Sequence, residues 1–391
     1  MQETVFVVKV SKFCNLRCHY CYEHRELSVR DVMSGETLER LFAGVDAFGD
    51  ELCARGIAPK FSFVWHGGEP LLLPPEYYRR ITEMQQHHIR RFAYRNSVQT
   101  NLFGINTDAL KFAIAAGWEL GVSIDFADAI RTNAGGRDSH GTVIAAAETL
   151  RKSGVRFGAI SVLGMHNRNA LGDAYDWVAE FAEGWRILPM FSGGPEDSLS
   201  RLRLPEEEVV RVFCELFERR AGAKTHIPIA PLDDYVKWAA LKIADHRVTG
   251  DILRDVLDNI FVINVNGDVF TRPFAYDREF CLGNIKTASL PEMIGGETYR
   301  SCRQTILGRK LHNCAGCEYR GFCDTSPMHE HGSVTDDADG GRCVVTRRTI
   351  QDIERELTVA GVDRAVIETW AREELPIPPL PQTDPRVRGE R

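Results

Sequence analysis

The sequence predicts an α/β protein, in which a partial (β/α)6 barrel is followed by a small cysteine-rich domain with a β-hairpin and helices. Two patterns support this prediction. Apolar segments of strand length alternate with amphipathic helical segments through residues 4–191, which is typical of βα units that build a parallel sheet. Near residue 260, IFVINVNGDVF joins two apolar runs through an Asn-Gly turn, a strong hairpin signal, and a cysteine-rich stretch follows it.

Six strands are expected in the barrel. They read TVFVVKV (4–10), KFSFVWH (60–66), NSVQTN (96–101), ELGVSID (119–125), RFGAISVLG (156–164) and GWRILPMF (184–191). Helices are expected between them, with Ser34 and Thr107 as N-caps. Gly117, Gly154 and Gly184 follow helical runs, as C-terminal glycines do.

Shifts in composition suggest four regions. The barrel is expected to occupy residues 1–191, a linker with helices 192–254, the cysteine-rich domain 255–350, and a C-terminal helix with a proline-rich, disordered tail 351–391.

The composition restricts the classes of function. The formal net charge is -7 over 391 residues, with basic residues scattered among acidic ones, which argues against a nucleic acid as partner. The chain shows no secretory signal and no long apolar run, so a cytoplasmic protein is expected. Eleven cysteines in such a protein indicate metal binding or catalysis, because the cytosol keeps thiols reduced.

Three cysteines follow the first strand directly. Cys14, Cys18 and Cys21 are spaced C-x3-C-x2-C, and in barrels of this kind the chemistry lies at the carboxyl ends of the strands. Three ligands leave one coordination position open, as in metal centres that perform chemistry. With Tyr20 before the last cysteine, the motif resembles that of the radical S-adenosylmethionine (SAM) enzymes. A zinc site of the three cysteines with His19 or His24 is the alternative.

The resemblance implies a four-iron, four-sulfur cluster on the three thiolates, with SAM on the open iron. It also implies SAM contacts further along the chain. In WHGGEP, Gly67, Gly68 and Glu69 match the family's motif for the SAM amino group, and glycines allow the backbone to approach a ligand closely. The remaining expected SAM contacts are Tyr20, Gln99, Asn101, Ser123 and Arg131.

Two details of that region stay open. Asp125 and Arg131 could instead form a buried ion pair or a cap. Phe126 stands where relatives often have glycine, which puts the shape of that loop in question.

A second cysteine group lies near the C-terminus. Cys314, Cys317, Cys323 and Cys343 give the spacing C-x2-C-x5-C-x19-C, which makes a closed site of four thiolates. Together with LGNI at 282–285, it resembles the SPASM/twitch extension that holds auxiliary clusters. The cysteines expected for a first auxiliary cluster are missing near Arg272, Ala288 and Pro327. We therefore expect one auxiliary 4Fe-4S cluster, with structural zinc as the alternative.

The other cysteines and the general base are less determined. Cys281 and Cys302 could complete a further site with His329 or His331, or one could donate a hydrogen atom, but buried apolar roles are more common. Asp268, Asp277 and Glu279 lie near the hairpin and are candidate bases. Turn or surface carboxylates are their ordinary alternative.

The resemblance also implies a reaction. A reduced cluster would cleave SAM to methionine and a 5′-deoxyadenosyl radical, which abstracts a substrate hydrogen. A fully ligated auxiliary cluster suits electron acceptance, which favours a two-electron oxidation. Because most SPASM members of the family act on ribosomal peptides, the resemblance implies a peptide substrate and an oxidative crosslink as product. Segments 131–143 and 225–236 resemble peptide-modifying members, including those that form cyclophane-type C–C bonds.

The sequence is also compatible with other substrates and partners. A dehydrogenase or epimerase acting on a sugar or aminocyclitol is the alternative enzyme, and a non-catalytic metal protein is the alternative class. The first strand starts within the first few residues and leaves no room for a leader-binding domain. A peptide leader is therefore expected to bind the barrel, the second domain or a separate protein. Electrons are expected from an external donor such as flavodoxin or ferredoxin.

Overall fold

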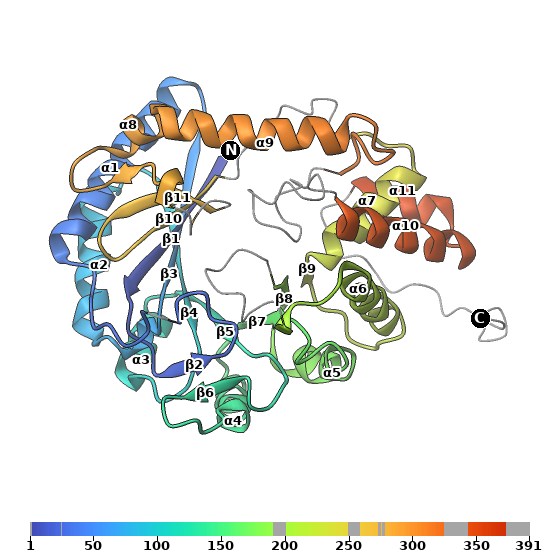
Figure 1. The fold of residues 1–391 in the computed structure, drawn as a ribbon, viewed down its shortest axis with the longest axis horizontal. Coiled ribbons are helices and arrows are strands. Elements are labelled where there is room, and N and C mark those ends of the chain that lie inside the picture. Colours follow the sequence, from blue (N-terminus) through green and yellow to red (C-terminus); the bar gives the residue numbers. More distant parts are fainter. Residues whose placement is uncertain are drawn as a thin grey trace. The chain divides into compact units, whose positions relative to one another are not determined.

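The computed structural model describes residues 2–24, 26–190, 201–248, 259–272, 275, 278–323 and 343–372. The chain forms two compact units whose segments alternate along the sequence (Figure 1). The first unit contains Met1–Ile124, Asp128–Phe157 and Asp255–Leu307. The second contains Asp125–Ala127, Gly158–Arg254 and Gly308–Arg391.

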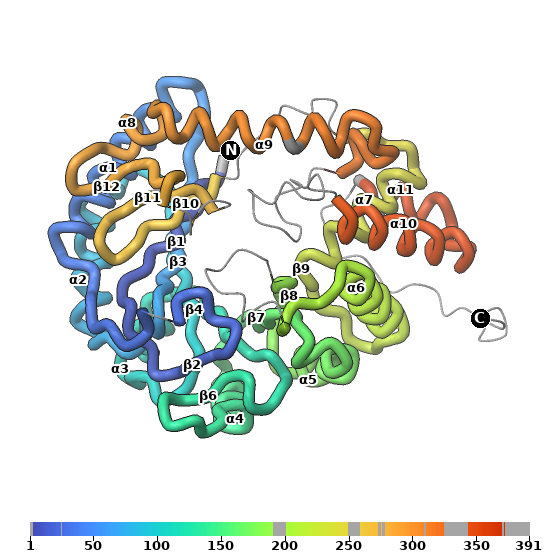
Figure 2. Tube along the Cα trace, in the orientation of Figure 1, coloured from blue at the N-terminus to red at the C-terminus, as the bar shows by residue number. Residues whose placement is uncertain are grey.

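The first unit is built on a mixed sheet. Its strands, in spatial order, are β12 (Gly283–Asn284), β11 (Asp268–Thr271), β10 (Ile260–Ile263), β1 (Gln2–Ser11), β3 (Pro59–Gly67), β4 (Ala93–Thr100) and β5 (Glu119–Ser123). The strands from β10 to β5 are parallel, whereas β11 and β12 are antiparallel. Figure 2 shows the return of the chain that places β10 beside β1. The expected hairpin therefore extends this sheet.

Helices cover one face of this sheet. They are α1 (Gly35–Ala54), α2 (Pro75–His88) and α3 (Thr107–Ala115). Aromatic side chains of α2 and α3 pack against Trp118, just before β5. Phe42 of α1 packs against Phe63 and Trp65 of β3. Because side chains alternate along a strand, the residues between these apolar ones point to the opposite face. The same unit contains α4 (His140–Lys152), α8 (Leu290–Gly295) and a two-stranded sheet of β2 (Leu16–Cys18) and β6 (Arg131–Asn133).

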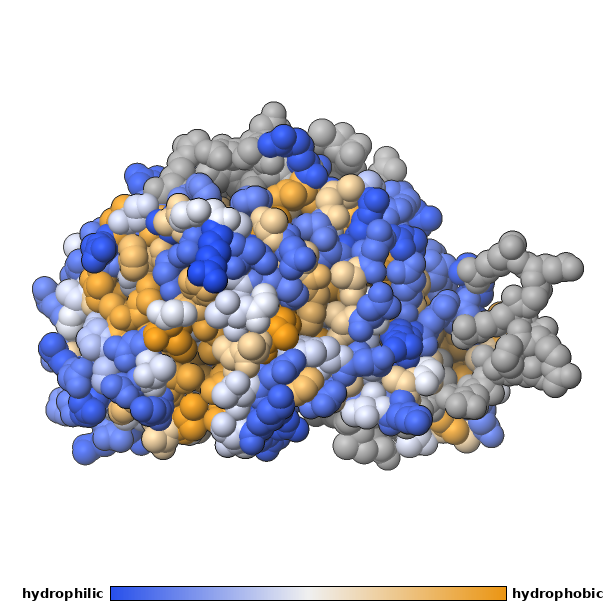
Figure 3. All heavy atoms as spheres, turned by 90° about the horizontal axis from the view of Figure 1, so that it is seen from below, coloured by the Kyte–Doolittle hydropathy of each residue, from blue (hydrophilic) through white to orange (hydrophobic). Residues whose placement is uncertain are grey.

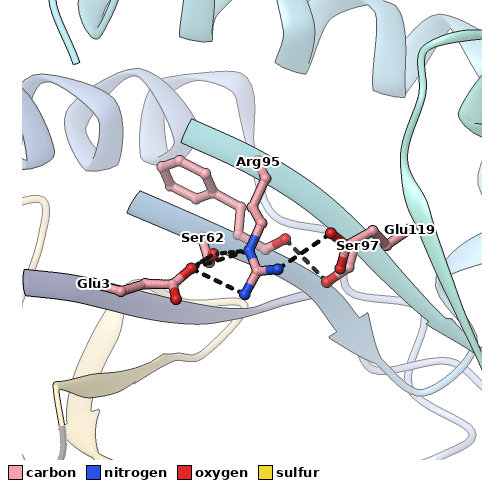
Figure 4. Close-up of polar contacts among 6 residues, drawn as sticks. Glu3, Ser62, Arg95, Ser97 and Glu119 are labelled. Atoms are coloured by element: carbon pink, nitrogen blue, oxygen red, sulfur yellow. Dashed lines mark hydrogen bonds and ion pairs between the residues drawn. The ribbon is translucent and has the colours of Figure 1, made fainter. Parts of the chain in front are cut away.

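The opposite face is polar near the amino ends of the parallel strands. Glu3 accepts hydrogen bonds from Ser62 (2.6 Å) and from Nε of Arg95 (3.0 Å), and Arg95 also donates to Glu119 (3.2 Å) (Figure 4). The Ser62 hydrogen bond and the nearby Arg95 lower the pKa of Glu3. This network joins four strands and lies at the end of the sheet away from the cysteine loop.

The second unit combines a short parallel sheet with helices. The strands are β7 (Gly158–Leu163), β8 (Trp185–Pro189) and β9 (Ile229–Ala230), and the helices are α5 (Leu171–Phe181), α6 (Glu206–Ala221), α7 (Leu232–Ile243), α10 (Val344–Val359) and α11 (Arg364–Arg372). Helix α10 packs against α6 and α7. The hydroxyl of Tyr319 donates to Glu354 of α10 at 2.6 Å. Helix α9 (Glu297–Cys314) runs from the sequence of the first unit into that of the second.

The helix ends agree with most of the expected signals. Ser34 caps α1 and accepts a hydrogen bond from Thr37, as predicted. The prediction for α3 was wrong by one residue, because Asn106 is the N-cap and accepts from Asp108 and Ala109, while Thr107 is the first helical residue. Gly117 and Gly154 follow their helices in the left-handed conformation. Gly184 does not, since α5 ends at Phe181 with Ala182 as its C-cap.

No helix in the described part of the chain is both long enough and apolar enough to cross a membrane. The face drawn in Figure 3 carries hydrophilic and hydrophobic side chains side by side. The most exposed large apolar side chain among those described is Val359, at 61%.

Candidate functional site

The three N-terminal cysteines lie on one loop that begins where β1 ends. Cys14 is buried, and Cys18 and Cys21 are half-buried beside it against Leu16 and Leu27. The backbone N–H of Cys21 donates to the carbonyl of Cys18 at 3.0 Å, which closes a tight turn. The loop is anchored by β2, which pairs with β6. The sequence spacing thus brings the three thiols to one small apolar region.

The surroundings of these thiols bear on what they could hold. Burial raises the pKa of Cys14 to about 11 and that of Cys21 to about 12, so a cation is needed to keep them as thiolates at neutral pH. Cys14 Sγ accepts from the N–H of Leu16 at 3.4 Å and lies 3.7 Å from the amide nitrogen of Asn101. A sulfur with hydrogen-bond donors in a dry pocket fits an iron-sulfur cluster.

The alternative for these three thiols is a mononuclear zinc site completed by His19 or His24. Within the described ranges, no three His, Cys, Asp or Glu side chains converge closely enough to hold one metal ion, and this holds for both cysteine groups. His19 and His24 are both exposed.

The glycine turn after β3 lies directly against the cysteine loop. Gly68 donates its N–H to the carbonyl of Ser11 (2.8 Å), and Glu69 donates to that of Phe13 (2.9 Å). A Cβ on Gly67 would lie 2.2 Å from the carbonyl oxygen of Ser11, and one on Gly68 would lie 2.3 Å from that of Phe13. Gly67 also has a φ of +134°, which favours glycine. Both glycines are therefore needed for the two loops to touch.

Glu69 is a buried carboxylate that joins the ends of β3 and β4. One oxygen accepts from the N–H of Leu71 and the hydroxyl of Thr100, both at 2.9 Å, and the other accepts from the N–H of Asn101 at 2.7 Å. Both carboxylate oxygens of Glu69 are therefore hydrogen-bonded within the protein. Burial raises the pKa of Glu69 to about 7 despite these donors.

The polar side chains expected at the ends of β4 and β5 do meet. Gln99 donates to the hydroxyl of Ser123 at 2.8 Å, and it lies over Gly121, where a Cβ would come within 2.2 Å of its oxygen. Asn101 donates to Asn15 at 3.0 Å. Asn15 was not predicted as a site residue. Its signal was its place directly after Cys14 in the motif, since it links the cysteine loop to β4.

Arg131 lies on β6 and connects to the cysteine loop. Its guanidinium donates to the hydroxyl of Tyr20 at 2.8 Å, and its exposed fraction is 8%. Asp125 belongs to the second unit, where its carboxylate accepts from the N–H of Val162 at 2.8 Å. Phe126 has a φ of +54°, the conformation that glycine would favour, and its ring packs against Trp185.

The second cysteine group surrounds the junction between α9 and α10. Cys314 ends α9, and the N–H of Cys317 donates to its carbonyl at 3.2 Å. Cys323 donates its N–H to the carbonyl of Tyr319 at 3.0 Å. Cys343 begins α10, and its N–H donates to the side chain of Asn313 at 3.3 Å. Cys343 therefore lies near the end of α9, which brings residues distant in sequence to the region of Cys314 and Cys317. All four thiols are half-buried.

Two family profiles match this chain. The radical SAM superfamily matches residues 8–178, and the SPASM iron-sulfur cluster-binding domain matches residues 255–318. This chain is a radical SAM enzyme with a C-terminal SPASM domain.

Curated relatives agree with this assignment. A serine-type anaerobic sulfatase-maturating enzyme of Bacteroides thetaiotaomicron is 26% identical over 370 residues, which cover 86% of this chain and 85% of the relative. A cysteine-type enzyme of Clostridium perfringens is 28% identical, with 82% and 87% covered.

The fold is shared with two solved proteins. A structure of native anSMEcpe with bound AdoMet has a TM-score of 0.72 at 20% identity and covers 94% of this chain and 100% of its own. Streptococcus suis SuiB bound to S-adenosylmethionine has a TM-score of 0.57 at 14% identity, with 85% and 77% covered. The predicted α/β partial barrel with a cysteine-rich second domain is confirmed.

As a radical SAM enzyme, the chain uses SAM and a 4Fe-4S cluster, and its SPASM domain binds an iron-sulfur cluster.

The remaining candidate residues lie near the hairpin of the first unit. Cys281 donates to the carbonyl of Gly283 at 3.5 Å and packs against Val262 and Phe270, and Cys302 is fully buried on α9. Asp268 accepts from Asn284 at 2.8 Å within the turn.

Glu279 is exposed in a short 3-10 helix, Arg278–Phe280. The other predicted ligands and bases near the SPASM domain, Asp277, His329 and His331, lie outside the described residues.

Proposed function

We propose that this enzyme removes two electrons from a residue of a peptide substrate and forms an oxidative crosslink between side chains, including a cyclophane-type C–C bond. The observation that supports an oxidation is the group of four half-buried thiols around α9 and α10, which the chain has in addition to the three-cysteine loop. Four thiolates leave no position for a ligand, so a cluster held by them is suited to accept an electron.

We assign the residues as follows. Cys14, Cys18 and Cys21 hold the SAM cluster, and SAM lies against Tyr20, Gly67, Gly68, Glu69, Gln99, Asn101, Ser123 and Arg131. When bound, the cluster and SAM supply the 5′-deoxyadenosyl radical that removes a hydrogen atom. The side chains of the chain orient SAM and exclude water: Glu69 fixes the glycine turn, and Gln99 with Ser123 presents polar atoms at the carboxyl ends of the strands.

The auxiliary centre is proposed as one 4Fe-4S cluster on Cys314, Cys317, Cys323 and Cys343. It would accept the electron left on the substrate after a bond forms, and an external donor such as flavodoxin or ferredoxin would reduce the SAM cluster. A separate leader-binding protein is the proposed partner for a peptide that needs one.

A second candidate is oxidation of a single serine or cysteine in a protein. It is favoured by the relatives, which are named as serine-type and cysteine-type sulfatase-maturating enzymes and align with most of this chain. A solved structure of similar fold is described with a bound peptide. Both candidates use a peptide segment as substrate and remove two electrons.

The experiment uses the anaerobically reconstituted enzyme with SAM, dithionite and a panel of blocked peptides that contain serine, cysteine and aromatic residues. The expected result is loss of two hydrogen atoms by mass spectrometry. Missing fragment ions between two positions would identify a crosslink, whereas reaction with hydroxylamine would identify a new aldehyde on serine. Oxidation of sugars or aminocyclitols with no change in any peptide would contradict the proposal.

A further inference from the structure

Four polar side chains of unknown role lie where the first unit's sheet meets the cysteine loop. They are Lys9 on β1, His66 on β3, and Tyr22 and Glu23 just after Cys21. Lys9 is 5% exposed, unusual for a lysine. It forms an ion pair and hydrogen bond with Glu23, and its ammonium lies 5.2 Å from the centre of the Tyr22 ring.

Strand register places His66 beside Lys9. The two residues are partners across the parallel β1–β3 pair, so their side chains share the face opposite α1 and α2. On the other side of β3, Trp65 pairs with Val98 of the parallel strand β4. The residues that follow them, His66 and Gln99, therefore lie beside one another. Gln99 in turn bonds Ser123. A row of polar side chains therefore crosses the carboxyl end of the sheet, from Lys9 to the proposed SAM contacts.

A hydrogen bond determines which ring nitrogen of His66 carries the proton. The N–H of Gly67 donates to its Nδ1 at 2.7 Å, so a neutral imidazole carries its proton on Nε2. Burial lowers the pKa of His66, which keeps the ring neutral. In the described part of the chain no group accepts a hydrogen bond from Nε2. His66 is half-buried, so a ligand can reach the ring.

Glu23 supplies a hydrogen-bond acceptor to complement the N–H donor of His66. One oxygen of its carboxylate is held by Lys9, and the described residues donate no hydrogen bond to the other. Glu23 reaches the same face of the sheet through its ion pair with Lys9, and Lys9 is the strand partner of His66. Because Lys9 compensates the carboxylate, the cluster presents one donor and one acceptor with little net charge.

A peptide group matches this pattern, since its carbonyl accepts and its N–H donates while the group is neutral. Lys9 and Glu23 form an ion pair, so neither charge of this pair is left to attract a charged ligand on its own. We infer that His66 and Glu23, with Lys9 as the positioning residue, bind a backbone amide of the substrate next to SAM. This inference rests on the proposed peptide substrate and identifies where its main chain would be held.

The test measures binding of acetyl-serine N-methylamide, the smallest blocked peptide, to the reconstituted holoenzyme with SAM, by saturation-transfer NMR. Replacing His66→Phe keeps an aromatic ring but removes the donor, and should raise the dissociation constant about tenfold, the usual effect of one hydrogen bond in a partly buried site. His66→Gln restores an N–H at similar reach and should bind nearly as wild type does.

A second variant removes the acceptor without leaving an unpaired charge. The double change Lys9→Met with Glu23→Leu should weaken binding by a similar factor, about tenfold. Exposed residues supply the matched controls: Glu26→Gln, whose carboxylate pairs with Lys12, and His87→Phe on α2 should leave the dissociation constant unchanged.

SAM binding and iron content are measured on every variant. Equal peptide affinity in wild type and His66→Phe, no binding to wild type, or a parallel loss of SAM binding would each overturn the inference. The proposed function is judged separately: oxidised peptides formed equally well by His66→Phe would leave that function standing and reject this subsite. Peptide binding that depends on His66, without oxidation of any peptide, would support this subsite and reject the proposed function.

Discussion

Gly67 and Gly68 are the residues at which the local geometry of the site is most restricted. Their backbone lies against that of Ser11 and Phe13, the carbonyls that position the start of the cysteine loop. This contact is between two main chains, so no side-chain rearrangement can relieve an added methyl group. The close approach explains two adjacent glycines without reference to a ligand, and it places the turn where SAM is proposed to bind.

Gly68→Ala is expected to lower the free energy of unfolding by about 1–3 kcal/mol, because the new methyl would overlap a backbone carbonyl. It should also reduce the iron content. Urea unfolding and iron analysis measure both effects. Gly141→Ala is the matched control, since no atom lies within 4 Å of its added methyl and alanine favours a helix. Equal stability of the two variants would contradict the close contact.

The buried Glu69 predicts a pH dependence of stability in the cluster-free protein. Its pKa is raised from 4.5 to about 7 on folding, so the folded state binds more protons than the unfolded state between these values. The free energy of unfolding should therefore fall as pH rises through this window. Comparing wild type with Glu69→Gln by urea unfolding at several pH values isolates this contribution. A difference that is constant with pH would show that Glu69 does not titrate there.

Sequence spacing could predict the cysteine loop and the glycine turn, because these residues are contiguous. It could not predict the Lys9, Glu23 and His66 cluster. Lys9 meets His66 only through the register of β1 with β3, and Glu23 reaches Lys9 only because the loop folds back over the strand. Asn15 was missed for a similar reason, since its partner Asn101 comes from β4.

At the scale of elements, hydrophobic periodicity predicted the six barrel strands and the hairpin because each is a continuous segment with a regular pattern. Element ends were less certain. Asn106 and Thr107 are both plausible caps from sequence, and only the backbone conformation distinguishes them. The pairing of β10 with β1 also depends on contacts far apart in sequence.

The α3 cap gives a direct comparison. Asn106→Ala is expected to lower the free energy of unfolding by about 1 kcal/mol, because two backbone N–H groups lose their acceptor. Thr107→Ala, at the first helical position, should change it by much less. Chemical denaturation of both variants measures the difference. A larger effect for Thr107→Ala would place the helix start one residue later.

At the scale of the whole molecule, two cysteine groups lie on separate compact units that draw on alternating parts of the chain. The group in the first unit occupies one loop, whereas the group in the second depends on the fold, because the end of α9 must meet the start of α10. The spacing of cysteines predicted both groups. The number of clusters and the metal in the second group depend on chemistry that spacing alone does not determine.

The most direct test of the account is iron and sulfide content with electron paramagnetic resonance on the anaerobically reconstituted protein. It compares wild type with Cys14→Ala/Cys18→Ala/Cys21→Ala and with Cys314→Ala/Cys317→Ala/Cys323→Ala/Cys343→Ala. We expect about eight irons in wild type and about four in each variant, as for two 4Fe-4S clusters. About four irons in wild type and none in the first variant, with zinc retained, would show a structural second site and contradict the proposed oxidation.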